Sequence, residues 1–430
     1  MAETGISNRS FRLVCARSEI PAVESLLHAE GFEFVPSGIS EWARRLTKEP
    51  HPLGSSYAAF FGLIYIQEEL SLLPPLYLNP APGSLVLDMC ASPGGKVGFL
   101  AQLLAEGGAA VANEPVTKRC YLMRDNLERL NLMNAVTSRY PGESLPFLPE
   151  SFSSILLDAP CSGWGTVYKY LEGEAMQEDV KHLLNTQRRL LQKAAEILAP
   201  GGRILYSTCT ANFRENEEQM RYAADNLGLN IKPLQEIPGL KYEEPQDEDM
   251  EGVLRIRSSH SDRGYFFVAC LEKPPQGNGK DISPKDARVG ESGRDHLIVG
   301  DGLHSNTLED MFCWENLPPG KVELFRKRLV FLPDMARQVL PENYYWWGAT
   351  LGRVHKNKFH PNPRMRVLLP PAEEDGSAIL ATRIADLDRL LSGQSLNVSS
   401  RQRLMGLYWH DLPLGWLKVK GGRCLWSDRY

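Results

Sequence analysis

The chain has 430 residues, of which 43% are apolar and 23% are charged, and its formal net charge is −5. This size and composition are typical of two or three globular domains and exclude a membrane span, because no apolar run reaches ~18 residues. The start has no basic stretch before an apolar one, which argues against a secretory signal. The eight scattered cysteines form no CxxC pair, so we expect reduced thiols in a cytoplasmic protein, with neither a disulfide framework nor a metal site.

The N-terminal residues predict a small α+β module. Phe11–Cys15 and Gly31–Val35 have the composition of short strands. Between them, the helical spacing of apolar residues predicts a helix over Ile20–Glu30. A further helix is predicted over Tyr65–Leu73, ended by Pro74-Pro75.

The following segment alternates strands and helices, which predicts a parallel sheet with right-handed crossovers. Buried strands are predicted over Ser84–Met89, Ala109–Asn113, Ser153–Asp158, Ile204–Ser207 and Tyr265–Leu271. Helices are predicted over Lys96–Leu104, Thr117–Leu132 and His182–Leu198, the last closed by Pro200-Gly201-Gly202.

The composition changes again downstream. Pro274–Gly293 is rich in Pro, Gly, Ser, Lys and Asp, which indicates a linker. The remainder has tryptophans among short apolar segments and predicts a separate, mostly-β domain. Its basic stretch Arg353–His360, with Arg364 and Arg366, fits an RNA-backbone patch and a solvated charged edge almost equally well. The pair Trp346-Trp347 favours core packing over a stacking platform.

Two cysteines each follow the carboxyl end of a predicted strand. Cys161 follows the strand that ends at Asp158, and Cys209 follows the strand that ends near Ser207. Ligands of open α/β sheets bind at these carboxyl ends. Two thiols and a carboxylate there suit a reaction that needs a nucleophile and a second acid/base group. The other cysteines take the default role of core packing.

The junction of the first sheet strand and its helix has features of a cofactor site. Gly94-Gly95 lets backbone N–H groups approach a ligand, and a helix N-terminus favours a carboxylate or phosphate. Glu114, at the end of the second strand, is placed to accept hydrogen bonds from ribose hydroxyls. The segment is neither GxGxxG nor a Walker loop, so a nucleoside without a phosphate chain fits best. A plain tight turn would use the same glycines.

Three segments together resemble the signature of RNA (cytosine-5) methyltransferases: Asp88–Lys96, Asp158–Gly163, and Tyr206–Thr210 followed by Glu215-Asn216-Glu217. Tyr65–Glu68 and Gly264–Ala269 are similar to the motifs that flank the catalytic fold. The resemblance spans residues 53–273.

The closing segments, Pro413–Lys418 and Gly421–Arg423, resemble the bacterial type that modifies 16S ribosomal RNA and carries a C-terminal PUA-like domain. The resemblance implies a Rossmann-like S-adenosylmethionine-dependent methyltransferase sheet. We therefore expect a small N-terminal α+β RNA-binding module at 1–50, the catalytic domain at 51–273, a linker at 274–299 and a mostly-β, PUA-like RNA-binding domain at 300–430.

The resemblance also implies the reaction and the roles of site residues. A methyl group from S-adenosylmethionine would pass to C5 of a cytidine in ribosomal RNA through a covalent Cys–C6 intermediate. Cys209 takes the role of nucleophile, Cys161 that of product release, and Asp158 and Lys96 complete the catalytic set. The cofactor-binding set would be Cys90, Ala91, Ser92, Pro93, Gly94, Gly95, Lys96, Glu114 and Asp158.

The expected partner is RNA, with no membrane and no metal, and the expected state is a monomer. Transfer RNA is the alternative substrate, and a non-catalytic RNA-binding assembly factor is the alternative function. A methyltransferase of DNA or protein fits less well, because DNA cytosine enzymes place their nucleophile on the Pro-Cys element and here the Thr-Cys element is also complete.

Two features depart from the family pattern. The family has an Asp after the third strand, near the cofactor adenine, and Tyr140 stands in that place here. We therefore assign no adenine contact at this position. The N-terminal region is also shorter than the family's helical lead-in, so its share of RNA binding is expected to be reduced or moved elsewhere.

Overall fold

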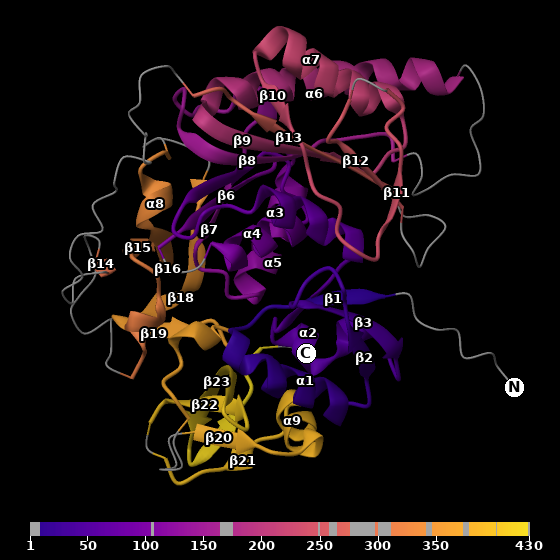
Figure 1. Cartoon of the computed structure of the whole chain (residues 1–430). Coiled ribbons are helices and arrows are strands. Elements are labelled where there is room, and N and C mark those ends of the chain that lie inside the picture. The colour runs from indigo at the N-terminus through magenta and orange to yellow at the C-terminus, as the bar shows by residue number, and fades with distance from the viewer. Residues whose placement is uncertain are drawn as a thin grey trace, which may run out of the picture.

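The computed structural model describes residues 9–104, 107–163, 175–247, 250–257, 265–275, 297–299, 311–340, 346–372, 378–400 and 402–428. Within these residues the chain forms four β-sheets (Figure 1). The largest has ten strands and occupies the upper half of the view. The N-terminal sheet lies below it, and the two C-terminal sheets lie beside and beneath the others.

The ten-stranded sheet has a parallel centre, as predicted. Its order is β11-β12-β13-β9-β8-β5-β6-β7-β17, and β10 pairs with β13. The parallel strands are β5 (Leu85–Asp88), β6 (Ala109–Asn113), β7 (Ala135–Ser138), β8 (Phe152–Asp158) and β9 (Leu198–Thr208). The antiparallel strands are β10 (Asn230–Lys232), β11 (Lys241–Glu243), β12 (Leu254–Arg257), β13 (Tyr265–Glu272) and β17 (Trp346–Trp347).

Helices cover both faces of this sheet, which buries side chains on both sides of the parallel strands. One face carries α3 (Leu73–Leu78), α4 (Gly95–Leu103) and α5 (Thr117–Arg129), and the other carries α6 (Ala175–Ile197) and α7 (Glu217–Leu227). Successive residues of one strand point to opposite cores: Ile155 and Leu157 face one, and Leu156 faces the other. The Rossmann-like prediction is confirmed.

The N-terminal sheet has the order β2-β3-β1-β4. Its elements are β1 (Ser10–Leu13), β2 (Glu33–Pro36), β3 (Ala43–Lys48), β4 (Ile64–Ile66), α1 (Ile20–Ala29) and α2 (Tyr57–Phe60). Its fourth strand therefore comes from beyond residue 50.

The predicted helix over Tyr65–Leu73 is wrong. Tyr65 belongs to β4, a 3₁₀ turn follows, and α3 begins at Leu73 with two prolines in its first turn. Proline is tolerated there because the N–H it lacks has no partner within the helix. Pro74-Pro75 therefore begins a helix instead of ending one.

The C-terminal region is β-rich, as predicted. One sheet has the order β14-β15-β16-β18-β19, and the other β20-β22-β23-β24-β21. The strands of the first sheet are β14 (Leu297–Val299), β15 (Gly320–Phe325), β16 (Arg328–Pro333), β18 (Ala349–His355) and β19 (Lys358–Pro361). The strands of the second sheet are β20 (Ala378–Ala381), β21 (Leu396–Asn397), β22 (Leu404–Trp409), β23 (Leu412–Lys420) and β24 (Arg423–Leu425). The helix α8 (Asp334–Arg337) follows β16, and the helix α9 (Ile384–Leu391) lies between β20 and β21.

Short 3₁₀ turns connect these elements at Arg17–Glu19, Leu53–Ser55, Glu69–Leu72, Gly142–Ser144, Phe213–Glu215, Trp314–Asn316 and Arg366–Leu368. Most of the predicted linker, residues 276–296, lies outside the described residues. Whether the β-rich region is PUA-like stays a prediction.

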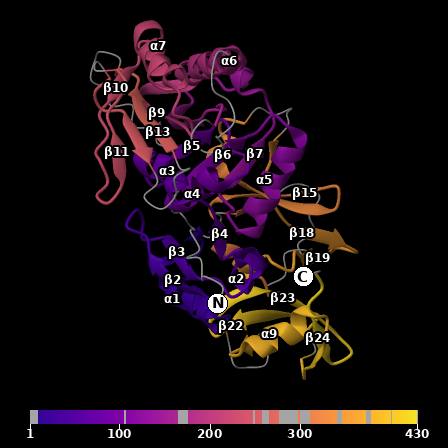
Figure 2. The same ribbon diagram turned by 90° about the vertical axis from the view of Figure 1, so that its right-hand side faces the viewer.

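The C-terminal region contacts the rest of the protein at several places. The predicted Trp pair forms β17, which extends the catalytic sheet by pairing with β7. The second C-terminal sheet and the N-terminal module share one hydrophobic core, in which the Phe61 ring meets Trp426 edge-on at 5.5 Å. Figure 2 shows α9 and β22 directly below the N-terminal module.

Arg364 and Arg366 hold these parts together, so the prediction that they belong to an RNA-facing patch is wrong. Arg366 is half-buried and donates to the carbonyl oxygens of Phe61, Val14 and Leu130 at 2.9, 3.0 and 3.2 Å. Arg364 forms an ion pair with Asp428 at 2.9 Å and lies over the ring of Phe60. The two guanidinium groups thus supply hydrogen-bond donors to carbonyl and carboxylate oxygens that would otherwise be unpaired.

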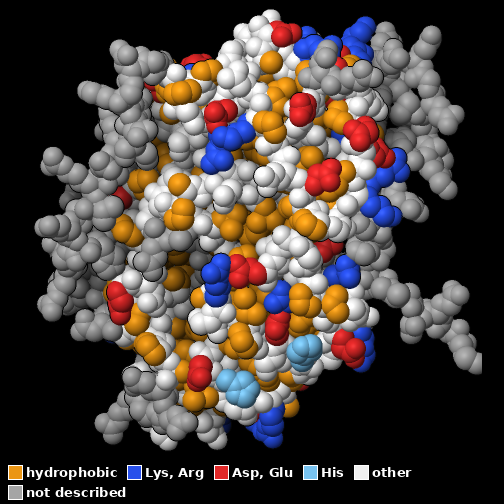
Figure 3. Space-filling view, in the orientation of Figure 1, with side chains coloured by type: hydrophobic (Ala, Val, Ile, Leu, Met, Phe, Trp, Pro, Cys, Tyr) orange, Lys and Arg blue, Asp and Glu red, His pale blue; other side chains and the backbone are white. Residues whose placement is uncertain are grey.

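The described surface is of mixed charge. On the face shown in Figure 3, basic and acidic side chains are interspersed with apolar ones. No helix in the described part of the chain combines the length and the apolar character needed to cross a bilayer.

Candidate active site

The two cysteines that follow predicted strands meet at the carboxyl edge of the sheet. β8 and β9 are parallel neighbours, with Asp158 opposite Ser207 in register. The chain leaves each strand in the same direction, so Cys161 and Cys209 lie side by side with their Sγ atoms 3.3 Å apart. Both are half-buried.

A charged pair lies next to the thiols. Lys96, in the first turn of α4, donates from Nζ to Asp158 Oδ2 at 2.8 Å. The hydroxyl of Ser207 donates to the other carboxylate oxygen, Oδ1, at 2.7 Å. The Lys96 ammonium also lies 5.3 Å from the centre of the Phe266 ring. The structure thus brings together all four residues predicted as catalytic.

The two thiols differ in their electrostatics. A hydrogen bond from Cys161 lowers the pKa of Cys209; burial and Asp158 oppose this, and the Lys96 charge supports it. The same hydrogen bond, together with burial, raises the pKa of Cys161 well above its ordinary value. Because the thiolate is the nucleophilic form of cysteine, Cys209 is the thiol of the pair that is better suited to act as a nucleophile, and its predicted role stays a prediction.

Lys96 remains a cation in this setting. Burial alone lowers its pKa, but the Asp158 carboxylate outweighs burial, and the pKa of Lys96 is raised. Its positive charge therefore persists beside Cys209 at neutral pH.

A buried carboxylate that sequence reasoning did not single out links the two cysteine loops. Glu215 is fully buried and accepts hydrogen bonds from the backbone N–H of Ser162 at 2.9 Å and from its hydroxyl at 2.5 Å. It also accepts from Gln187 Nε2 at 3.1 Å and from Asn212 Nδ2 at 3.2 Å. Ser162 follows Cys161, and Asn212 belongs to the loop after Cys209, so Glu215 sets the spacing between the loops. Its only sequence signal was its place in Glu215-Asn216-Glu217.

The two residues after Glu215 support the loop of Cys209. Asn216 accepts from the Thr208 hydroxyl at 2.6 Å and donates to the carbonyl of Thr210 at 2.8 Å, which fixes the backbone on both sides of the cysteine. Glu217 forms a buried ion pair with Arg255.

The predicted cofactor loop is a close-packed turn between β5 and α4. Gly94 has a φ of +107°, a conformation that side chains disfavour. A Cβ on Gly95 would lie 2.9 Å from both Gln67 Oε1 and the Tyr65 ring. The loop is tied to the neighbouring strand by the N–H of Ala91, which donates to the Asn113 carbonyl at 2.9 Å. Glycine is therefore needed at both positions.

Cys90, Ser92 and Pro93 complete the predicted loop. The thiol of Cys90 packs against the apolar core, and burial raises its pKa, which fits the expected packing role. The hydroxyl of Ser92 donates to the carbonyl of Arg119 at 3.2 Å, and the carbonyl of Pro93 accepts from Asn126 at 3.0 Å.

Asp88 is a second residue that sequence reasoning left out of the site. It ends β5, is 1% exposed, and one carboxylate oxygen accepts from the N–H of Cys90 at 3.2 Å. Its other oxygen, Oδ2, is buried without a hydrogen-bond partner among the described residues. Burial, together with the charge of Asp158, raises the pKa of Asp88 to about 7. A buried acceptor without a partner is what a donor on a bound molecule would satisfy.

Glu114 lies at the end of β6, where a ribose was expected. One oxygen of its buried carboxylate accepts from the N–H of Val116 at 2.9 Å, and the other lies 3.3 Å from the exposed guanidinium of Arg119. Tyr140 brings no carboxylate to this region. Its backbone N–H donates to Asn113 Oδ1 at 3.1 Å, and its carbonyl accepts from Asn113 Nδ2 at 3.0 Å.

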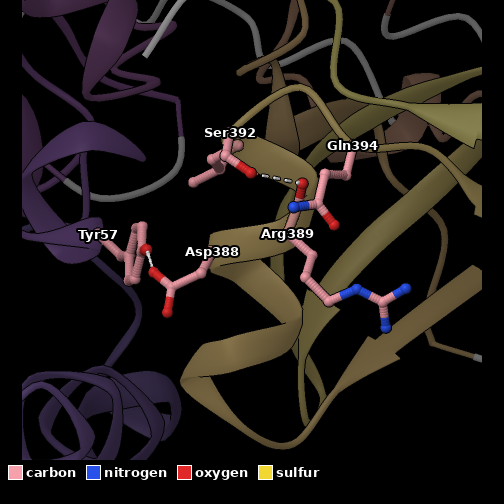
Figure 4. A pocket seen from close by; sticks show the side chains of 6 residues that line it. Tyr57, Asp388, Arg389, Ser392 and Gln394 are labelled. Atoms are coloured by element: carbon pink, nitrogen blue, oxygen red, sulfur yellow. Dashed lines mark hydrogen bonds between the residues drawn. The ribbon is translucent and has the colours of Figure 1, made fainter.

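A cavity of about 280 Å³ lies away from these residues, between the N-terminal module and α9. Figure 4 shows the Tyr57 hydroxyl donating to Asp388 and the Ser392 hydroxyl donating to the carbonyl of Arg389. None of the predicted site residues lines it.

Comparisons with known proteins show that the chain is similar to methyltransferases. A family model described as 16S rRNA methyltransferase RsmB/F matches residues 75–272. Ribosomal RNA small subunit methyltransferase F of Vibrio parahaemolyticus is 30% identical over 338 residues, which cover 76% of this chain and 69% of the relative. The protein of the same name from Vibrio campbellii is 36% identical, with coverages of 75% and 68%. The crystal structure of a methyltransferase homolog protein from Pyrococcus horikoshii superposes with a TM-score of 0.53 at 34% identity, over 62% of this chain and 86% of that one.

Proposed function

The chain belongs to the RsmB/F family of 16S rRNA methyltransferases, and from this premise we propose that it methylates C5 of a cytidine in small-subunit ribosomal RNA. The observation that carries the proposal is the 3.3 Å contact of Cys161 and Cys209 beside the Lys96–Asp158 pair. This set supplies a thiolate, a second thiol and a fixed charge at one edge of the sheet.

Cys209 acts as the nucleophile. C5 of cytosine is a poor nucleophile towards a methyl donor, and addition of a thiolate to C6 makes C5 carbanion-like, which splits one difficult step into two easier ones. The Lys96 charge favours the thiolate of Cys209. The Asp158 carboxylate, held by Lys96 and Ser207, would accept a hydrogen bond from the exocyclic amino group of the base and orient the ring for attack at C6. The target base must leave its stack to reach these residues.

The residues of the β5–α4 turn fit S-adenosylmethionine as cofactor. The orphaned oxygen of Asp88 suits the ammonium group of its amino-acid part, and Glu114 suits its ribose hydroxyls. When bound, the cofactor supplies an electrophilic methyl group on a sulfonium ion.

Cys161 serves as the base that allows product release. Its hydrogen bond to Cys209 is the largest cause of its raised pKa. Once Cys209 is bonded to C6, that sulfur no longer carries a thiolate charge, so Cys161 can ionise more easily. Cys161 then takes the C5 proton, directly or through water, and the electrons of the C5–H bond re-form the ring double bond as Cys209 leaves.

The proposed substrate places the reaction in the cytoplasm, and the protein acts as a monomer. Incubation with radiolabelled S-adenosylmethionine and purified small-subunit RNA, transfer RNA or DNA tests the proposal. Label in small-subunit RNA alone, mapped by bisulfite sequencing to one cytidine and lost in Cys209→Ala, is the expected result. Label in transfer RNA alone would support the alternative substrate.

A non-catalytic RNA-binding factor is the second alternative. Such a protein would bind RNA and transfer no label to any of the three nucleic acids. The contact of the two thiols beside the Lys96–Asp158 ion pair argues against it, because binding of RNA alone requires no such arrangement.

A further inference from the structure

Four side chains form a continuous row of ring and guanidinium contacts between the catalytic sheet and the C-terminal region. The Arg124 guanidinium lies 4.8 Å from the Tyr121 ring and 5.3 Å from the Trp347 ring. The Trp347 ring in turn meets Phe325 edge-on at 5.0 Å. Tyr121 and Arg124 come from α5, Trp347 from β17, and Phe325 from the end of β15. We call this row, Tyr121–Arg124–Trp347–Phe325, the aromatic row.

Both ends of the aromatic row are open to solvent. Tyr121 is 49% exposed and Phe325 is 46% exposed, whereas Arg124 and Trp347 between them are half-buried. The middle of the row is thus held in place by packing and by the Trp347 indole N–H, which donates to the Thr350 hydroxyl at 3.1 Å. Arg124 and Trp347 in turn contact the Tyr121 and Phe325 rings, and this support reduces the side-chain entropy that the two end rings lose when a planar ligand stacks on them.

In two hairpin tips beside the aromatic row, all the charged side chains are those of Lys and Arg. The β15–β16 tip has Arg326, Lys327 and Arg328, and the β18–β19 tip has Arg353, Lys356 and Lys358; all six are exposed. The N–H of Val354 donates to the carbonyl of Lys327 at 2.8 Å, which holds the tips together. In Figure 2, β15 and β18 project past α5 at the right of the view. We call these six residues the basic tips.

The charges of the basic tips are not balanced within the described chain. Arg328 lies directly opposite Arg353 across the strands, an arrangement of like charges that is destabilising. No carboxylate forms an ion pair with any of the six in the described residues, and the nearby Glu323 pairs with Lys321. The mixed charge of the face in Figure 3 shows what an ordinary surface of this protein looks like.

We infer that the aromatic row and the basic tips bind a single-stranded segment of the substrate RNA, with bases stacked on Tyr121 and Phe325 and phosphates held by the tips. This inference rests on the proposed function. Exposed rings beside unpaired cations match the two requirements for binding single strands, a stacking platform and a basic track. A paired duplex hides its base faces and would use the cations alone.

The location suits delivery of RNA to the cysteines. β17 pairs with β7, and β7 is separated from β8 by β6 and β5. Neighbouring strands lie about 4.8 Å apart, so β17, which carries Trp347, lies on the order of 19 Å from the strand that precedes Cys161. A few nucleotides of extended RNA span this separation, which places the bound segment close to the target cytidine.

The test measures binding of a fluorescein-labelled, cytidine-containing single-stranded RNA and of its duplex by anisotropy at several salt concentrations. Tyr121→Ala with Phe325→Ala should weaken single-strand binding by about ten-fold or more and leave duplex binding unchanged. Lys327→Ala with Lys356→Ala should weaken both and reduce the slope of log K against log salt by about 0.7 for each lost contact to the single strand. Leu148→Ala, which trims a side chain that is 77% exposed, and Lys241→Ala are matched controls.

Unchanged single-strand binding in both double variants, with unchanged thermal midpoints, would overturn the inference. So would normal binding of free RNA with loss of methylation only on assembled small subunits, because the surface would then contact a protein. Failure of the proposed function is distinguished by the wild-type chain, which would transfer no methyl group to any RNA.

Discussion

The sulfur of Cys161 lies 3.3 Å from that of Cys209, and the loops that carry them leave neighbouring parallel strands. Direct contact of the two sulfurs makes each thiol set the proton affinity of the other. In the proposed mechanism, the same contact would let the two residues act in sequence on one cytosine, first as nucleophile and then as base.

Substitution of either cysteine separates these roles. Cys209→Ala should lower turnover by at least about 10³-fold and form no covalent RNA adduct, because the nucleophile is absent. Cys161→Ala should still attack and methylate, but it should accumulate a protein–RNA adduct that survives a denaturing gel. Normal turnover in both variants would contradict the assignment.

Removal of the Lys96 charge should change the pH dependence of Cys209. The Lys96 ammonium helps to lower the pKa of Cys209, and thiolate is the reactive form, so alkylation of Cys209 rises as pH passes its pKa. Lys96→Gln removes a positive charge, raises this pKa, and should move the rising limb to higher pH. Mass spectrometry of iodoacetamide adducts measures the shift, and Lys181→Gln on the exposed side of α6 serves as control.

Glu215 is a positioning residue, and Glu215→Gln tests it. Loss of the charge weakens four hydrogen bonds, each of the charge-assisted kind. We expect kcat to fall by about 10-fold to 100-fold, with little change in cofactor affinity. The half-exposed Glu218, which pairs with Arg188, gives a matched control as Glu218→Gln. Equal effects of the two substitutions would show that Glu215 has no special role.

Arg366→Met should destabilise the whole protein. It removes donors from three buried carbonyl oxygens, each of which costs about 1 to 3 kcal/mol when left unpaired. The free energy of unfolding in urea should therefore fall by about 3 kcal/mol or more. Arg353→Met, on an exposed strand position, should change it by less than about 0.5 kcal/mol.

The raised pKa of Glu30 predicts that the free energy of unfolding of the N-terminal module depends on pH. Burial raises the pKa of Glu30 from 4.5 to about 8, against the hydrogen bond from the Tyr57 N–H. The folded state therefore holds the proton more tightly than the unfolded state, and the stabilisation present below pH 4.5 is lost as pH rises towards 8. Glu30→Gln should raise the melting temperature at pH 8 and leave it nearly unchanged at pH 5. The opposite order of effects would refute the assignment.

The parallel sheet was predictable because four of its five parallel strands contain a continuous apolar run and are followed by a helix; β7, which is followed by a 3₁₀ turn, was not predicted. β6 has the predicted bounds, β5 is shorter than predicted by one residue at each end, and β8 begins one residue earlier than predicted. The errors arose where proline or glycine is compatible with more than one local structure. Pro200-Gly201-Gly202 was expected to close a helix, but these residues lie inside β9, where the register is irregular.

The site was predictable only where a residue carries its own chemical signal. Cys161 and Cys209 stand out because a thiol at a strand end is informative by itself. Glu215, Asp88 and Arg366 do not, because their importance comes from burial and from partners far along the chain. Arg366 was grouped with exposed cations by sequence proximity, and only the packing of three regions around it shows its structural role.

The core shared by the N-terminal module and the last sheet has a consequence for synthesis of the chain. Phe61 and its neighbours are made early in translation, but their packing partners Leu417, Cys424 and Trp426 follow only after roughly 350 further residues. During elongation the module must therefore expose apolar surface until these partners leave the ribosome. Nascent chains halted before this point should need a chaperone to stay in solution.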